Sequence, residues 1–211
     1  MKPLRLEGIT DLVVVGAHCD DIAIGAGGTL LRLAPHRVRA LVLTGGGTAR
    51  EEEERTALAA FLPDAQLDVT VLDLPDGRLP GHWGTVKQTL NDLAADSAGG
   101  ADLVLGPQRH DAHQDHRLVA ELLPTAFRDH LVLGYEILKW EADLPATTVY
   151  QPLDGTHAAE KVRLLIEHYP SQAHHDWFDR EAFEALMRVR GVQCHARWAE
   201  AFVAEKLVLE T

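Results

Sequence analysis

Two short polar stretches of this chain hold the residue types that bind divalent metal ions. The first is His18-Cys19-Asp20-Asp21, and the second, far downstream, is His113-Gln114-Asp115-His116. Two imidazoles and a carboxylate that leave coordination positions open suit a catalytic zinc ion, and iron(II) accepts the same ligands. A hydrogen-bonded turn with aspartates capping the next helix would explain the first stretch alone. It would not explain the second, so the sequence predicts one metal site built from both.

The flanking segments predict where these stretches lie. Residues 12–15 form a continuous apolar run that predicts a strand buried on both faces, and residues 29–33 form the core of a helix. Residues 103–105 predict another short buried strand just before the second stretch. Ligands of open α/β sheets bind at the carboxyl ends of the strands, so both stretches are expected at that edge. His113 and His116 would share one face of a first helical turn.

The rest of the chain alternates between strand and helix patterns. Such alternation predicts βαβ units and therefore an α/β, Rossmann-like three-layer sandwich with a mostly parallel central sheet. We expect a single domain over residues 1–211, because no repeat or long linker divides the chain. Further strands are predicted at 38–43, 67–72, 131–136 and 147–150, and helices at 50–62, 86–95, 118–123, 158–168 and 180–190; the apolar piece 206–209 ends the chain.

Three local features have non-catalytic interpretations. The acidic run Glu51 to Glu54 is expected as a solvated helix start, where the helix dipole favours negative charge. The glycines at 25–28 do not fit a dinucleotide fingerprint, because Leu30 stands where the third glycine belongs, so we expect them to pack helix against sheet. Cys19 is expected to be a packed small residue, because its side chain should point away from that of His18.

Composition limits the class of protein. The 211 residues are 46% hydrophobic and 25% charged, as in ordinary globular proteins, and the net charge of -12 argues against nucleic acid or an anionic membrane as partner. No apolar run has the length of a signal peptide core or a bilayer span. Two isolated cysteines, Cys19 and Cys194, favour a reducing cytoplasm over a disulfide framework. The oligomeric state is left open, a homo-oligomer included.

The motifs in their order resemble the PIG-L/LmbE-like family of zinc-dependent N-deacetylases. The resemblance rests on His18 to Asp21, on Gly-Gly-Thr-Leu at 27–30 and on His113 to His116. It extends over most of the chain, because further matching segments follow in the same order: Thr44-Gly45, Arg50 with Glu53, Pro75-Asp76-Gly77, and residues 169–172, 190–192 and 199–202. Cys19 replaces the usual proline and Ile22 the frequent glutamate, and neither departure removes a ligand.

The resemblance implies a role for each matching residue. His18, Asp21 and His116 would bind the metal, Asp20 would be the general base, and His113 would stabilise the oxyanion or protonate the leaving amine. Arg50 and Asp76 occupy positions where relatives contact the sugar. The implied substrate is an N-acetylated, sugar-like small molecule.

The residue chemistry agrees with amide hydrolysis. Zinc would polarise the acyl oxygen and lower the pKa of bound water to about 7, and Asp20 would take the proton. A protonated His113 would stabilise the oxyanion, held in its cationic form by Asp111 or Asp115. Two rivals remain. One is a metal-dependent hydratase of the same superfamily. The other is an inactive metal-dependent binding module, against which the presence of Asp20 and His113 argues.

Overall fold

The structure is a computed structural model that describes residues 3, 5–6, 8–97 and 100–208. Strands and helices alternate along the chain as far as Tyr135, as the sequence predicts. The strands are β1 (Asp11–Gly16), β2 (Arg37–Thr44), β3 (Gln66–Leu74), β4 (Leu103–Pro107), β5 (Val132–Tyr135), β6 (Val149–Leu153) and β7 (Trp198–Ala204). The helices are α1 (Asp21–Leu33), α2 (Ala49–Phe61), α3 (Trp83–Asp96), α4 (Gln114–Ala126), α5 (Gly155–His168) and α6 (Arg180–Gln193), with short 3-10 turns η1 (Leu79–His82) and η2 (Pro170–Gln172).

All seven strands form one sheet in the order β3-β2-β1-β4-β5-β7-β6. Neighbours from β3 to β5 pair in parallel, whereas β7 runs antiparallel to both β5 and β6. The predicted α/β, Rossmann-like fold with a mostly parallel sheet is confirmed. Strand β1 lies between β2 and β4, so the strand order changes direction there, and such a switch point is where open α/β sheets bind ligands.

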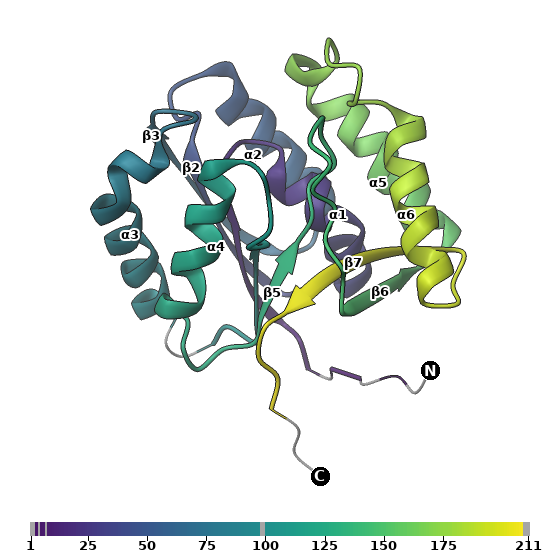
Figure 1. Ribbon diagram of the computed structural model, residues 1–211, viewed down its shortest axis with the longest axis horizontal. Coiled ribbons are helices and arrows are strands. Elements are labelled where there is room, and N and C mark those ends of the chain that lie inside the picture. The colour runs from purple at the N-terminus through teal and green to yellow at the C-terminus, as the bar shows by residue number, and fades with distance from the viewer. Residues whose placement is uncertain (1–2, 4, 7, 98–99, 209–211) are drawn as a thin grey trace.

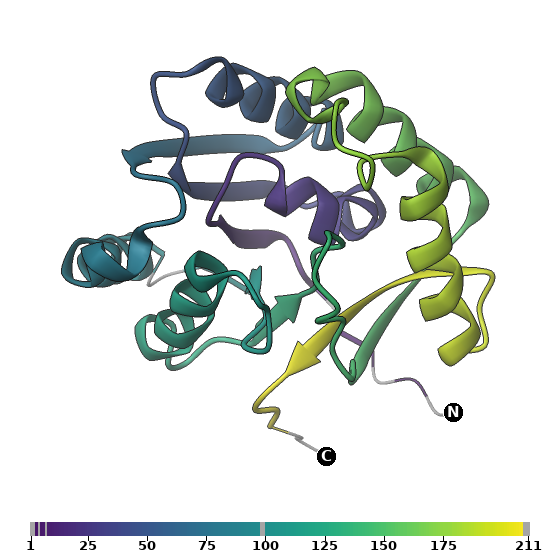
Figure 2. The ribbon, with the colours of Figure 1, turned by 45° about the horizontal axis from the view of Figure 1, so that its top comes forward.

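Helices cover the sheet on both faces (Figures 1 and 2). On one face α3 and α4 pack over Val13 and Val15 of β1, and on the other α1, α2 and α5 pack over Leu12 and Val14. The apolar run of β1 is therefore buried on both faces, as predicted. Within the described ranges, none of the helices has the length and apolar character needed to cross a bilayer.

The glycines of α1 let this helix approach its neighbours closely. A Cβ atom on Gly25 would lie 2.3 Å from the ring of Tyr135 on β5, and one on Gly27 would lie 2.7 Å from the ring of Phe61 on α2. A Cβ on Gly28 would lie 2.5 Å from Leu153. The expected packing role of these glycines is confirmed.

Strand β7 is the element that the sequence analysis missed. Its core-facing positions include Glu200, a charged residue that breaks the apolar alternation of a half-buried strand. Glu200 accepts hydrogen bonds from the backbone of Gly28 and Thr29 and pairs with Lys161 at 2.6 Å. Residues 206–208, which the structure describes, lie outside any helix or strand. Leu209, the end of the apolar piece noted above, lies outside the described residues.

Candidate metal centre

The two polar stretches meet at the carboxyl ends of adjacent strands. His18 and Asp20 lie in the turn between β1 and α1, and Asp21 is the first residue of α1. His113 is the N-cap of α4, and His116 lies in the first turn of that helix. Strands β1 and β4 are hydrogen-bonded neighbours, so the fold brings together residues that are distant in the sequence.

Metal-binding types of atom from three residues, His18, Asp21 and His116, face one another at this edge of the sheet. His18 Nδ1 lies 3.1 Å from His116 Nε2 and 3.6 Å from Asp21 Oδ2, while His116 Nε2 lies 3.2 Å from Asp21 Oδ1. Ligands bound to zinc at about 2.0–2.2 Å in tetrahedral geometry lie about 3.3–3.6 Å from each other. The three residues are almost completely buried. Ligand atoms of His18, His113 and His116 also lie within 4.8 Å of one another, so the cluster as a whole fits a divalent ion, and zinc and iron(II) both suit its chemistry.

In His18 and in His116, the outer ring nitrogen, which points away from the cluster centre, is held by a carboxylate. His18 Nε2 lies 3.2 Å from Asp115 Oδ2 and 3.1 Å from Asp76 Oδ1, and His116 Nδ1 lies 2.9 Å from Asp111 Oδ2. An outer N–H donated to a carboxylate leaves the inner nitrogen with a free lone pair, which is the tautomer that binds metal. Asp111 and Asp115, whose roles the sequence left open, thus orient the inner nitrogens toward the centre.

The same carboxylates set the electrostatics of the cluster. Burial alone would lower the pKa of His116, but Asp21 and Asp111 raise it to about 9. Burial alone would raise the pKa of Asp21, but the charges and hydrogen bonds of His116 and His18 hold it well below its usual value. The centre therefore favours positive charge, whether carried by protons or by a cation.

Asp20 lies beside the centre in a strained backbone conformation. Its φ of 122° is in the left-handed region, which costs a non-glycine residue about 1–3 kcal/mol. Its side chain caps none of the described residues of α1, so the capping alternative fails for Asp20. The carboxylate instead accepts a hydrogen bond from Arg50 Nη2 at 3.2 Å. Burial raises the pKa of Asp20 to about 7 despite the opposing charge of Arg50.

The backbone of Asp20 is held by a residue that the sequence analysis misjudged. Glu54 is fully buried, and its Oε2 accepts hydrogen bonds from Asp20 N at 2.9 Å and Tyr169 Oη at 2.8 Å. The expectation of a solvated acidic run is therefore wrong for Glu54. The helical spacing could have found it, because Glu54 shares the inner face of α2 with Ala57, Leu58 and Phe61.

His113 lies beside the cluster, but it is not held there by a carboxylate as expected. Its ring centroid lies 4.7 Å from that of His18 and 4.9 Å from that of His116. Burial lowers the pKa of His113, and the two neighbouring imidazoles lower it further. Within the described chain the side-chain carboxylates of Asp111 and Asp115 do not bond to this ring, because they hold the other two imidazoles. The expected carboxylate-held imidazolium is therefore not supported.

The hydrogen-bonding of His113 selects one neutral tautomer. Its Nδ1 accepts a hydrogen bond from the backbone N–H of Asp115 at 3.3 Å. A neutral ring that accepts at Nδ1 carries its hydrogen on Nε2. His113 can therefore present an uncharged N–H donor to a substrate oxygen.

Arg50 and Asp76, the residues assigned to substrate, border the same centre. Arg50 donates to the carbonyl of Cys19 at 2.6 Å, and Asp76 reaches His18 from the loop after β3. That loop is fixed by Asp115, which accepts from the backbone of Gly77 and Leu79. Cys19 itself is buried and donates to the carbonyl of Thr44, which confirms it as a packed residue.

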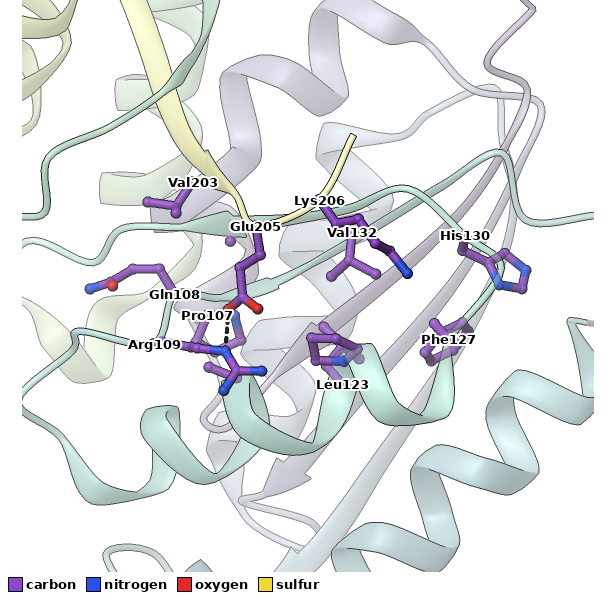
Figure 3. Close-up of a pocket in the computed structure, with 13 residues that line it drawn as sticks. Pro107, Gln108, Arg109, Leu123, Phe127, His130, Val132, Val203, Glu205 and Lys206 are labelled. Carbon is purple, nitrogen blue, oxygen red and sulfur yellow. Dashed lines mark hydrogen bonds and ion pairs between the residues drawn. The ribbon is translucent and has the colours of Figure 1, made fainter. Parts of the chain in front are cut away.

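A separate pocket lies on the far flank of α4 (Figure 3). It measures about 230 Å³ and is lined mainly by apolar groups of α4 and β5, with the ion pair of Arg109 and Glu205 at its side. None of the side chains of the metal centre is found among the described residues that line this pocket. We therefore place the candidate active site at the carboxyl ends of β1 and β4 and not in this pocket.

The fold and the buried His/Asp centre together define an α/β protein with a candidate divalent-metal site. The family model "PIG-L: GlcNAc-PI de-N-acetylase" matches residues 13–127, which is more than half of the chain and contains both polar stretches. The chain belongs to the PIG-L/LmbE-like deacetylase family.

Individual proteins are similar to this chain in sequence or in fold. The chain is 28% identical over 170 residues to the uncharacterized deacetylase YaiS of Escherichia coli K12, covering 74% of this chain and 89% of that protein. The N,N'-diacetylchitobiose deacetylase of Pyrococcus horikoshii has a similar structure, with a TM-score of 0.68, 18% identity and coverage of 92% and 83%. So does GalB, the 4-carboxy-2-hydroxymuconate hydratase of Pseudomonas putida KT2440, with a TM-score of 0.73, 16% identity and coverage of 96% and 98%. At these identities the two structures establish a common fold.

Proposed function

We propose that this chain is a metal-dependent N-deacetylase that removes an acetyl group from the amine of a sugar-like small molecule. The observation that carries the proposal is the convergence of His18 Nδ1, Asp21 and His116 Nε2 within 3.1 to 3.6 Å, flanked by Asp20. These three residues would hold the ion, zinc or iron(II). When bound there, the metal supplies the Lewis acidity that polarises an acyl carbonyl.

Four residues of the chain have separate roles in the proposed reaction. Asp20 accepts the proton of the attacking water, and its pKa near 7 suits a general base that works at neutral pH. His113 donates its Nε2–H to the developing oxyanion, which such a donor stabilises most where water is excluded. Arg50 orients the Asp20 carboxylate. Arg50 and Asp76 together line the approach for substrate hydroxyl groups.

The family supports the substrate class. Its model carries the name of a de-N-acetylase of an N-acetylglucosamine compound, and one structural relative is named for chitobiose. Asp76, whose side chain is 60% exposed beside His18, offers a carboxylate to a hydroxyl-rich ligand. We propose a cytoplasmic location, because the two isolated cysteines, Cys19 and Cys194, are typical of proteins of a reducing compartment.

Replacing Asp20 by Asn tests the proposal. We expect turnover of an N-acetylated amino sugar to fall by about 10²- to 10⁴-fold. The metal content should match that of the wild type, because Asp20 is not assigned as a ligand. Acetate release measures the rate, and elemental analysis measures the metal. Unchanged turnover with full metal would remove Asp20 from the mechanism.

One alternative function is favoured by a specific observation, the similarity of the fold to GalB over nearly its whole length. A hydratase would use the same base and metal to add water across a double bond. Incubating the metal-loaded protein with N-acetylglucosamine and assaying free acetate and primary amine separates the two activities. If no amide in a broad panel were hydrolysed, the deacetylase proposal would fail, and a hydratase or a binding module would take its place.

A further inference from the structure

Asp20 differs from the aspartates that begin two other helices of this protein. Asp154 and Asp179 are the N-caps of α5 and α6, with φ of -78° and -138°, and each carboxylate accepts a hydrogen bond from a backbone N–H in the first turn of its helix. Asp20 holds the same position before α1, but its φ is 122° and its carboxylate caps none of the described residues of that helix. Aspartate is a preferred N-cap residue, so the turn before α1 gives up a favourable conformation.

The unusual backbone of Asp20 is held from α2. Its N–H donates to Glu54 Oε2 at 2.9 Å, and the same oxygen accepts from Tyr169 Oη at 2.8 Å. Glu54 is fully buried and Tyr169 is 1% exposed, so water does not compete for these hydrogen bonds. A buried N–H without a partner is costly, and the bond to Glu54 therefore favours the conformation in which Asp20 is found.

The residues on either side of Asp20 are fixed by a different contact. Asp21 Oδ2 accepts from the backbone N–H groups of Ala17 and His18, both at 2.9 Å. Glu54 takes no part in this contact. Loss of the Glu54 carboxylate is therefore expected to release Asp20 and to leave the proposed metal ligands His18 and Asp21 in place.

We propose that Glu54 is a positioning residue, which directs the Asp20 carboxylate to the reaction centre by keeping Asp20 out of the N-cap conformation of α1. The inference rests on the proposed deacetylase function, in which Asp20 is the general base, and deepens it. Tyr169 fixes the Glu54 oxygen that accepts from Asp20. Without Glu54 the turn relaxes and the Asp20 carboxylate bonds to the first turn of α1, where it no longer reaches the attacking water.

Kinetics of two variants at Glu54 test this inference. Glu54→Leu removes the acceptor at similar size, whereas Glu54→Gln keeps an amide oxygen that can accept from both Asp20 and Tyr169. We expect Glu54→Leu to lower kcat for an N-acetylated amino sugar about 10- to 100-fold, with KM and bound metal as in the wild type, and Glu54→Gln to stay within about threefold of the wild type. Glu52→Leu, at an exposed position of the same helix, is the matched control and should behave as the wild type. A loss in both Glu54 variants, or in neither, would overturn the proposal.

Combination with Asp20→Asn separates positioning from a general structural effect. If Glu54 acts through Asp20, adding Glu54→Leu should lower the residual rate of Asp20→Asn by less than about twofold, because the carboxylate that Glu54 positions is already absent. Equal losses in the two backgrounds would contradict the proposal. Tyr169→Phe removes the donor to Glu54 Oε2 and should lower kcat about threefold to tenfold. If Glu54→Leu does not fold, this variant takes its place, and a wild-type kcat would then overturn the inference.

A measurement on the Asp20 backbone does not depend on any reaction. In isotopically labelled, zinc-loaded protein, the coupling between the amide and α protons of Asp20 reports φ, and amide exchange reports the bond to Glu54. In Glu54→Leu we expect the coupling to approach that of Asp154 and Asp179 and the exchange to become faster, while Glu54→Gln keeps the wild-type signals. If the wild type hydrolyses no amide, the deacetylase proposal fails, and these signals still test the hold of Glu54 on Asp20. Wild-type signals of Asp20 in Glu54→Leu would overturn the inference even in an active enzyme.

Discussion

At the scale of single residues, the centre depends on carboxylates that do not touch the metal position. Asp111 and Asp115 each hold the outer nitrogen of one imidazole, and Asp115 also fixes the loop that carries Asp76. This division gives Asp111 and Asp115, neither of which is assigned as a ligand, a role at the centre. The protein itself holds the imidazoles of His18 and His116 in place, so in the proposed function less entropy would be lost when they bind an ion.

This arrangement predicts that Asp111→Asn and Asp115→Asn each weaken metal affinity by about 10- to 100-fold without removing a ligand. Asparagine keeps the size of the side chain, but its neutral amide orients the imidazole more weakly. Competition with a chelator of known affinity measures the loss. Asp143→Asn is the matched control, because Asp143 also pairs with Lys139 but touches neither imidazole. Wild-type affinity in both variants would contradict the assigned roles.

At the scale of elements, the position of α1 decides where the catalytic turn lies. The helix can settle onto β5 only because Gly25 leaves space for Tyr135, whose hydroxyl donates to the carbonyl of Val15 at 2.6 Å. The turn that carries His18, Asp20 and Asp21 joins β1 to this helix. Close packing of helix on sheet therefore fixes the geometry of the metal centre as well as the core.

We expect Gly25→Ala to lower the free energy of unfolding by about 1–3 kcal/mol, because the new Cβ would overlap the Tyr135 ring. Urea denaturation followed by circular dichroism measures this change. Gly84→Ala in α3 is the control: a Cβ there would meet none of the described atoms within 4 Å, so the variant should gain up to about 1 kcal/mol from helix propensity. Equal stability of the two variants would argue against tight packing at Gly25.

At the scale of the whole molecule, buried Glu54 links three separate parts of the chain. It lies on α2, holds the backbone of Asp20 after β1, and accepts from Tyr169 at the end of α5. Its Oε1 is buried without a hydrogen-bond partner among the described residues. Burial raises the pKa of Glu54 to about 8 from its usual 4.5, so the folded protein keeps this carboxyl protonated at neutral pH.

The sign of the resulting pH dependence follows from proton binding. Between about pH 4.5 and 8 the unfolded chain loses this proton and the folded protein retains it. The stabilising contribution is therefore full below about pH 4.5 and is lost as the pH rises to about 8, with a slope of up to about 1.4 kcal/mol per pH unit.

Glu54→Gln should remove this contribution, so the metal-free variant should lose less stability than the wild type between pH 5 and 8. Denaturant unfolding at several pH values with a chelator present measures the difference. Glu52→Gln, which alters an exposed residue of the same helix, should follow the wild type. If the free energy of unfolding of Glu54→Gln fell with pH as steeply as that of the wild type, another group would cause the pH dependence.

The sequence by itself determined the class of fold, the two polar stretches of the candidate metal site and the family. Buried strands, helix periods and the order of motifs are local signals, and each was readable without knowledge of its neighbours. Local signals failed where a residue's partner was remote. Glu54 looked solvated because its partners Asp20 and Tyr169 are distant in sequence, and β7 was missed because Glu200 is satisfied by Lys161.

Only the tertiary structure decided which residues meet. The neighbouring positions of β1 and β4 bring His18 to within 3.1 Å of His116, and nothing in the intervening residues specifies that pairing. The structure also assigned Asp111 and Asp115 to different imidazoles and buried His113 beside two others, which lowers the pKa of His113. The physical reason is that hydrogen bonds and burial act over a few ångströms in space, whatever the separation along the chain.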